Sequence, residues 1–206
     1  MNLLAHLHLS FGCDPDTLTA NVLADYLGRY EPVDHMSESM KERLMPGILL
    51  HREIDSFTDQ HPVVAEARNV ISPERRRLGG IIIDIAFDYY LTRHWDKFST
   101  EERRVTISRG YATMAMVSST GLSRKTQSLI SKMSSRDWLN AYGTLEGQTL
   151  TFQRVSRVTP AVAGLEGAEQ EIVKNDAILD QYFLQFYPDL IKNVEEWQAL
   201  RKSGET

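Results

Sequence analysis

Cysteine pairs, long apolar segments and an excess of basic residues are all missing from this chain of 206 residues. Its one cysteine, Cys13, excludes an internal disulfide framework, which is typical of a reducing compartment, and gives only weak support for a thiol nucleophile. No apolar run approaches the length that crosses a bilayer, and the apolar residues 1–10 lack the basic start of a signal peptide. We therefore expect a soluble cytoplasmic protein without a membrane partner.

The charge balance argues against a nucleic-acid-binding protein, and the scarcity of β-type patterns argues against a β-sheet fold. A formal net charge of −5 argues against broad binding of nucleic acid, which would require an excess of lysine and arginine. Alternating patterns and hairpin dipeptides are scarce, although residues 80–83 alone could form a strand. Because the apolar spacing is helical almost throughout, the sequence predicts an all-α fold: a single domain, residues 1–206, of about seven to nine helices.

Capping residues and apolar spacing predict where these helices begin and end. Asp16 is the expected N-cap of a helix that Gly28 ends, and a turn is expected at residues 31–32. The next helix, residues 37–57, contains Pro46, which predicts a kink or a break. A capped start is expected at residues 99–102. The other expected helices cover residues 62–70, 74–95, 105–117, 122–133, 137–142, 145–158 and 168–201.

Two segments carry acidic and imidazole side chains at helical spacing. His51, Asp55 and Asp59 follow one another at steps of four residues, and Asp84 and Asp88 are also four apart within an apolar run. Residues four apart lie on the same face of a helix. Carboxylates among apolar residues are costly to bury unless they are paired, hydrogen-bonded or bound to a cation. The spacing therefore favours a metal site over ion pairs that only fix the packing.

One imidazole with several carboxylates is a ligand set for a hard or borderline cation. It indicates Mn²⁺, with Mg²⁺ as the alternative, rather than a structural zinc site. Such an ion can activate water and bind a phosphate oxygen, so phosphoester hydrolysis is the expected reaction. Arg52 and Arg93 are candidates for binding phosphate oxygens, and ordinary surface charge is the alternative. Asp25 lies among apolar residues and is expected to need a partner.

Five segments together resemble the acyl carrier protein phosphodiesterases, also called acyl carrier protein hydrolyases. The resemblance runs in order over nearly the whole chain and is therefore more specific than any single motif. The segments are residues 1–9 (MNLLAHLHL), 21–25 (NVLAD), 47–59 (GILLHREIDSFTD), 84–95 (DIAFDYYLTRHW) and 186–188 (FYP).

The resemblance implies a fold related to the HD-domain metal phosphohydrolases, although their adjacent His-Asp pair is absent here. It implies a manganese-assisted reaction that removes 4′-phosphopantetheine from a serine of holo acyl carrier protein. Residues 143–168 match least and receive no catalytic role. The metal site would comprise Asp25, His51, Asp55, Asp84 and Asp88, and the acid–base candidates are His6, His8 and Asp59.

Carrier proteins are small, acidic and helical according to this resemblance, so the enzyme would need a local basic surface. Arg75, Arg76 and Arg77 are the first expectation for this surface, followed by Arg154 and Arg157, and a solvated helix surface is the alternative. Two other functions stay open: a phosphohydrolase that acts on a nucleotide, and a helical binding module without catalysis. The pattern predicts no oligomeric state.

Overall fold

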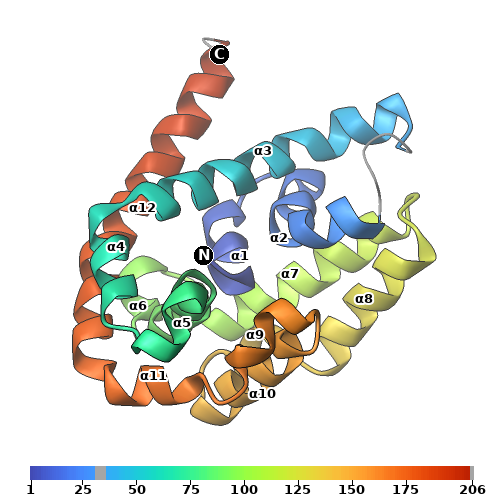
Figure 1. The fold of residues 1–206 in the computed structure, drawn as a ribbon. Coiled ribbons are helices and arrows are strands. Elements are labelled where there is room, and N and C mark those ends of the chain that lie inside the picture. The colour runs from blue at the N-terminus through green and yellow to red at the C-terminus, as the bar shows by residue number, and fades with distance from the viewer. Residues whose placement is uncertain (31–35, 205–206) are drawn as a thin grey trace. The chain divides into compact units, whose positions relative to one another are not determined.

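The computed structural model describes residues 1–30 and 36–204, with the side chain of Lys202 left out. This part of the chain contains twelve α-helices, two 3₁₀ segments and no strand (Figure 1). The all-α prediction is therefore confirmed, including the helical conformation of residues 80–83, whereas the predicted number of helices was too low. The turn predicted at residues 31–32 lies outside the described residues. An HD-domain-like arrangement stays a prediction.

The chain forms two compact units that alternate along the sequence. Unit 1 comprises Met1–Asn2, Ile54–His94 and Ala141–Thr206, and unit 2 comprises Leu3–Glu53 and Trp95–Asn140. The long helix α3 (Glu38–Gln60) contributes residues to both units. Interleaved units are compatible with one domain or two, so the single domain over residues 1–206 stays a prediction. Among the described residues, no helix is both long and apolar enough to span a bilayer.

Unit 2 is built around α2 (Pro15–Tyr30), which packs against three other helices of the unit. These are α1 (Leu3–Ser10), α7 (Arg103–Ser118) and α8 (Arg124–Ser135) (Figure 1). The short helices α6 (Trp95–Phe98) and α9 (Trp138–Ala141) complete the unit. Leu7, Leu23 and Met114 are fully buried in its core. Gly110 permits close packing of α7 on α1, because a Cβ atom there would lie 2.7 Å from a methyl carbon of Leu7.

Unit 1 is organised by the long helix α12 (Asp176–Ser203), which packs against α4 (Pro62–Asn69) and α5 (Gly79–Arg93). Aromatic side chains fill this contact: the ring centroid of Phe87 lies 5.6 Å from those of both Phe183 and Phe186. Aromatic pairs at such spacing contribute about 0.5–1.5 kcal/mol each beyond their burial. The remaining elements are η2 (Pro73–Leu78), α10 (Leu145–Ser156), η3 (Pro160–Leu165) and α11 (Glu169–Lys174).

Several predicted helix ends were wrong for local reasons. Asp14, not Asp16, caps α2, because its Oδ1 accepts the backbone N–H of Thr17 at 2.9 Å, and Gly28 lies inside the helix. Asp16 instead binds Arg43 of α3. The helix predicted over residues 168–201 divides at Asn175, whose backbone N–H and side-chain amide both donate to the Glu171 carbonyl.

The structure also differs from the predicted bounds of the helices over residues 74–95 and 105–117. Residues 73–78 form a 3₁₀ segment before α5, and α6 follows α5 as a separate short helix. Glu102 is the N-cap of α7 without a side-chain hydrogen bond, so the capped start expected at residues 99–102 is wrong in its detail. The start predicted at Ser37 is confirmed, because its hydroxyl accepts the backbone N–H of Met40 at 3.3 Å. Pro46 lies inside α3.

Candidate metal centre

Two buried histidines of unit 2 stack against each other beside α2. His6 comes from α1 and His51 from α3, and their ring centroids lie 4.1 Å apart with an interplanar angle of 20°. Both residues are more than nine-tenths buried. Buried imidazoles need hydrogen-bond partners that fix the position of the ring proton. In this unit, one residue, Asn21 of α2, provides a partner for each ring.

Asn21 fixes which nitrogen of His6 carries the proton. Its side-chain amide donates from Nδ2 to the His6 carbonyl at 2.7 Å, so its Oδ1 is the atom that faces the ring. This oxygen lies 3.1 Å from His6 Nδ1. Because a carbonyl-type oxygen only accepts, Nδ1 is the protonated nitrogen. A neutral His6 therefore presents Nε2 with its lone pair, which is the form that binds metals.

The backbone of Asn21 fixes His51 in the same way. Nδ1 of His51 lies 2.9 Å from the carbonyl oxygen of Asn21, so this nitrogen also carries the proton when the ring is neutral. The two imidazoles consequently present the same nitrogen, Nε2, as a ligand atom. Hydrogen bonds of this kind raise the ligand strength of an imidazole and fix its orientation.

A glycine explains how α3 comes close enough to α2 for this contact. Gly47 lies one turn before His51 on the same face of α3. A Cβ atom at this position would lie 2.2 Å from the Thr17 carbonyl oxygen and 2.8 Å from the Asn21 backbone nitrogen. Only glycine fits at such a distance. The chain uses it to place His51 next to the Asn21 carbonyl.

His6, His51 and Asp55 form a candidate metal-binding group. Each offers one ligand atom, and these atoms lie within 4.8 Å of one another. Asp55 follows His51 by one turn of α3, as the four-residue spacing predicted. The group contains two imidazoles, whereas the sequence analysis expected only one. Two nitrogens and one oxygen suit a transition metal such as Mn²⁺ or Fe²⁺ better than Mg²⁺, which prefers oxygen ligands throughout.

Asp25 lies on α2, one turn after Asn21. Its Oδ1 is 3.4 Å from Nε2 of His51, while its side chain is 84 % exposed. The sequence analysis expected a partner because apolar residues flank Asp25 in the sequence; His51 is a partner, but the exposed side chain shows that the assumed burial was wrong. An exposed carboxylate beside a ligand nitrogen can act as a further ligand or accept a proton from water.

The other predicted carboxylates, Asp84 and Asp88, lie on α5 in unit 1, and the Met1 ammonium connects Asp84 to Asp55. The Met1 ammonium donates to Asp84 at 3.0 Å and lies 3.5 Å from Asp55. Burial disfavours this ammonium, but Asp84 and Asp55 outweigh that effect, and its pKa is raised from 8.0. Asp88 is fully buried, and together with burial its charge raises the pKa of Tyr187. The helix α5 thus places Asp84 beside the Met1 ammonium and Asp88 in the core.

The remaining acid–base candidates have other contacts. His8 packs against Trp95, and its Nε2 donates to the Phe98 carbonyl at 3.1 Å. Burial lowers the pKa of His8 despite that hydrogen bond. Asp59 pairs with Arg68 of α4. Neither residue belongs to the candidate metal group among the described residues, and their acid–base roles stay predictions.

The arginines predicted to bind substrate differ in their availability. Arg93 is held by two carboxylates of α12, Asp176 at 2.9 Å and Asp180 at 3.3 Å. Burial lowers the pKa of Arg93, but its bonds to Asp176 and to the Tyr89 hydroxyl outweigh this, so the pKa is raised. Arg93 thus connects α5 to α12 through ion pairs. Arg52 is exposed on α3. Phosphate binding by either residue stays a prediction.

The arginine cluster predicted to dock the partner lies in η2, where Arg75 binds other residues of the chain. Arg75 donates to the carbonyls of Gly164 and Glu166 and pairs with Glu171 at 3.5 Å. Arg76 donates to the Ile71 carbonyl at 3.1 Å. These contacts account for Arg75 and Arg76 without a partner protein. The docking role of the cluster 75–77, like that of Arg154 and Arg157, stays a prediction.

Comparisons with known proteins place this chain beside one enzyme family. The model of the family "Acyl carrier protein phosphodiesterase" matches residues 1–190. The acyl carrier protein phosphodiesterase of Yersinia pestis is 30% identical over 203 residues, which cover 96% of this chain and 100% of the relative. That of Pectobacterium atrosepticum is 32% identical over 192 residues, which cover 93% and 96%. No solved structure matches this chain.

The fold and the histidine–aspartate group define an all-helical protein with a candidate metal centre. The family match over residues 1–190 is more specific: this chain belongs to the acyl carrier protein phosphodiesterase family. The predicted family and enzyme class are thereby confirmed.

Proposed function

We propose that this protein hydrolyses the phosphodiester that joins 4′-phosphopantetheine to a serine of holo acyl carrier protein, which yields the apo form. The observation that carries this proposal is the match to relatives of that name over at least 93% of the chain. In the reaction, an oxygen from water bonds to phosphorus and the bond from phosphorus to the serine oxygen breaks. One proton of the water ends on the serine oxygen, so the products are free 4′-phosphopantetheine and an unmodified serine.

A transition-metal ion, Mn²⁺ as the sequence analysis expected, would be held by Nε2 of His6, Nε2 of His51 and the carboxylate of Asp55. The position of the three ligand atoms within 4.8 Å of one another supports this assignment. When bound, such an ion supplies Lewis-acid chemistry: it makes water more acidic and withdraws charge from a phosphoryl oxygen. Asp25, Asp84 and Asp88 stay predicted members of the ligand set.

Residues next to the candidate metal group would orient its ligands and accept a proton. Asn21 holds both imidazoles with Nδ1 protonated, so that Nε2 is the nitrogen that carries the lone pair in each neutral ring. Asp25 is exposed beside His51 and is our candidate to accept the proton from the attacking water. Burial of His6 and His51 limits hydration of the ligand nitrogens, which strengthens their interaction with a cation.

The direct test is incubation of the purified protein with holo acyl carrier protein, followed by intact-mass spectrometry of the carrier. We expect conversion to the apo mass and release of 4′-phosphopantetheine, and we expect neither with the His51→Ala variant. A nucleotide panel tested in parallel distinguishes the alternative enzyme. Hydrolysis of a nucleotide with an unchanged carrier would contradict the proposal, and inactivity in both assays at full metal occupancy would favour a binding module.

A further inference from the structure

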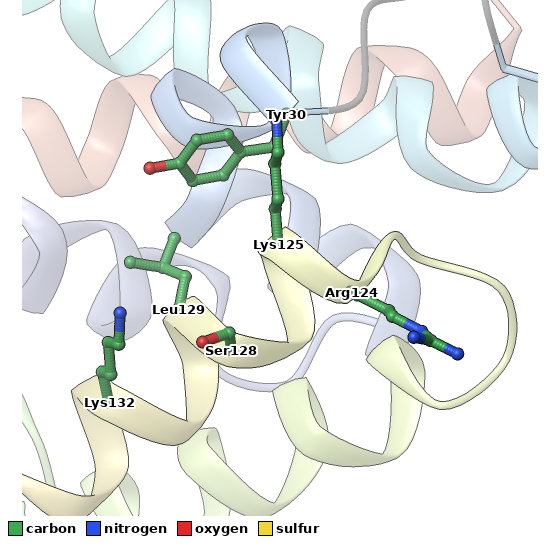
Figure 2. A pocket seen from close by; sticks show the side chains of 6 residues that line it. All are labelled: Tyr30, Arg124, Lys125, Ser128, Leu129 and Lys132. Carbon is green, nitrogen blue, oxygen red and sulfur yellow. The ribbon is translucent and has the colours of Figure 1, made fainter.

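A groove of about 460 Å³ lies between the end of α2 and one face of α8 in unit 2. Figure 2 shows the side chains of Lys125, Leu129 and Lys132 extending from α8 toward Tyr30, whereas Arg124 extends away. The first three residues are spaced by four and then three positions, which places them on one face of the helix. The groove is lined by Tyr30, Arg124, Lys125, Ser128, Leu129 and Lys132.

The groove is basic, and the described residues that line it include no acidic side chain. Arg124, Lys125 and Lys132 are exposed, and within residues 1–30 and 36–204 none of them forms an ion pair or side-chain hydrogen bond. This distinguishes them from Arg43, Arg75 and other arginines that are held by carboxylates. The buried Leu129 and the half-buried ring of Tyr30 add an apolar floor. Cations around an apolar floor complement a protein surface that carries carboxylates around an apolar side chain.

The groove and the surroundings of the candidate metal centre share the helix α2. Tyr30 follows Asp25 by five residues on α2, which is about 7.5 Å along the helix axis at 1.5 Å per residue. Asp25 in turn is 3.4 Å from His51 Nε2. A protein bound in the groove would therefore contact α2 about one and a half turns from Asp25, on a face that is turned about 140° around the helix axis.

We propose that this groove docks an acidic face of the carrier-protein part of the substrate. The inference rests on the proposed function, because only a substrate attached to a protein brings a second surface to the enzyme. The chain has a formal net charge of −5 and would repel an acidic partner as a whole. A local cationic groove overcomes that repulsion where the partner binds, since attraction depends on the nearby charges when salt screens the distant ones.

The test compares two charge-reversed pairs with the wild-type protein. The groove pair is Lys125→Glu with Lys132→Glu, at the second residue and in the last turn of α8. The control pair is Arg104→Glu with Lys174→Glu, which are exposed cations at the second residue of α7 and in the last turn of α11. Each pair changes the formal net charge from −5 to −9, because every reversal removes one positive charge and adds one negative charge.

We expect the groove pair to lower kcat/KM for holo carrier protein by about 10-fold or more at low ionic strength. The loss should fall to less than about 3-fold in 0.5 M salt, where the Debye length is only a few ångströms. The maximal rate at saturation should stay near that of the wild type, because the metal centre is untouched. The control pair should show a loss of about 2-fold or less, since its charges lie outside the groove.

Equal kcat/KM for the two variant pairs at low salt would overturn the docking proposal while the wild-type activity stands. A wild-type protein without activity on holo carrier protein would instead refute the proposed function. A third arm measures inhibition by apo carrier protein and by free 4′-phosphopantetheine. We expect the groove pair to weaken only inhibition by apo carrier protein. If inhibition by 4′-phosphopantetheine weakens instead, the groove binds the small anion and the proposal is wrong.

Discussion

Replacement of Gly47 by alanine tests the helix contact on which the candidate metal centre depends. The added Cβ would lie 2.2 Å from the Thr17 carbonyl oxygen, with no flexible side chain able to move aside. Relief of this overlap requires α3 to move from α2 by about 1 Å, since Cβ atoms in proteins essentially never come within 3.0 Å of another such heavy atom. The same shift would lengthen the 2.9 Å contact from His51 Nδ1 to the Asn21 carbonyl beyond hydrogen-bonding distance.

The energetic cost of Gly47→Ala follows from three contributions. Overpacking costs about 1–3 kcal/mol, and a weakened buried hydrogen bond adds about 0.5–1.5 kcal/mol. The higher helix propensity of alanine offsets about 1 kcal/mol. We therefore expect a net destabilisation of about 0.5–3.5 kcal/mol, which lowers Tm by about 1–14 °C in a chain of this size.

The assay for Gly47→Ala combines thermal unfolding by circular dichroism with calorimetric titration of Mn²⁺. We expect metal affinity to fall by about 10-fold or more, because displacement of a hydrogen-bonded ligand histidine has such effects. Gly28→Ala is the matched control, since a Cβ there meets nothing within 4 Å and the residue lies inside α2. The control should be stabilised by about 0.5–1 kcal/mol. Wild-type stability and metal affinity in Gly47→Ala would refute the reasoning.

Two further substitutions test individual hydrogen bonds. Asn21→Leu removes the acceptor for His6 Nδ1–H, so we expect metal affinity to fall about 10–100-fold and the ¹⁵N spectrum of His6 to show a mixture of tautomers. A single Nδ1-protonated tautomer with wild-type affinity would contradict this role. In wild type, burial raises the pKa of Glu171, but hydrogen bonds from Ser72 and the charge of Arg75 outweigh it, so the pKa is below 4.5. The stabilisation by this carboxylate is therefore present above pH 4.5 and is lost as pH falls through the lowered pKa. Chemical denaturation should give Glu171→Gln a lower free energy of unfolding than wild type. This difference should be constant above pH 5 and should shrink by at most about 1.4 kcal/mol per pH unit below pH 4.5. A difference that does not depend on pH would contradict this explanation.

The helical spacing of His51 and Asp55 predicted the part of the candidate site that lies on one element. Residues four apart on a helix share a face whatever else the chain does, so their proximity needs no knowledge of the fold. The same reasoning identified α5 as a helix with two carboxylates. It could not show that Asp84 binds the Met1 ammonium, because this contact joins residues 83 positions apart.

The contacts of His6 and Asn21 could not be predicted, for the same physical reason. His6 was expected to act in acid–base chemistry, and its place beside His51 arises only when α1 and α3 pack on α2. Asn21 received no role, although it lies one turn before Asp25 on the same helix face and is fully buried. A buried amide one turn from a candidate ligand was the signal available in the sequence.

The basic clusters show that a local charge pattern does not reveal the partners of a charged side chain. Arg75 was the first candidate for docking because three arginines are adjacent there. Its carboxylate partner, Glu171, is 96 residues away along the chain, and no local pattern reveals such a pair. Lys125 and Lys132 are seven residues apart and attract less attention in the sequence, yet the fold places both beside Tyr30.

The central claim is that hydrolysis of holo acyl carrier protein depends on an ion held by His6, His51 and Asp55. The most direct measurement strips the wild-type protein of metal with a chelator, then titrates Mn²⁺ while ion binding and release of 4′-phosphopantetheine are followed together. We expect one tightly bound ion per chain, with activity rising in proportion to occupancy, and neither binding nor activity in His6→Ala or His51→Ala variants that retain their helical content. Full hydrolysis by the stripped protein, or wild-type ion binding by both variants, would contradict the account.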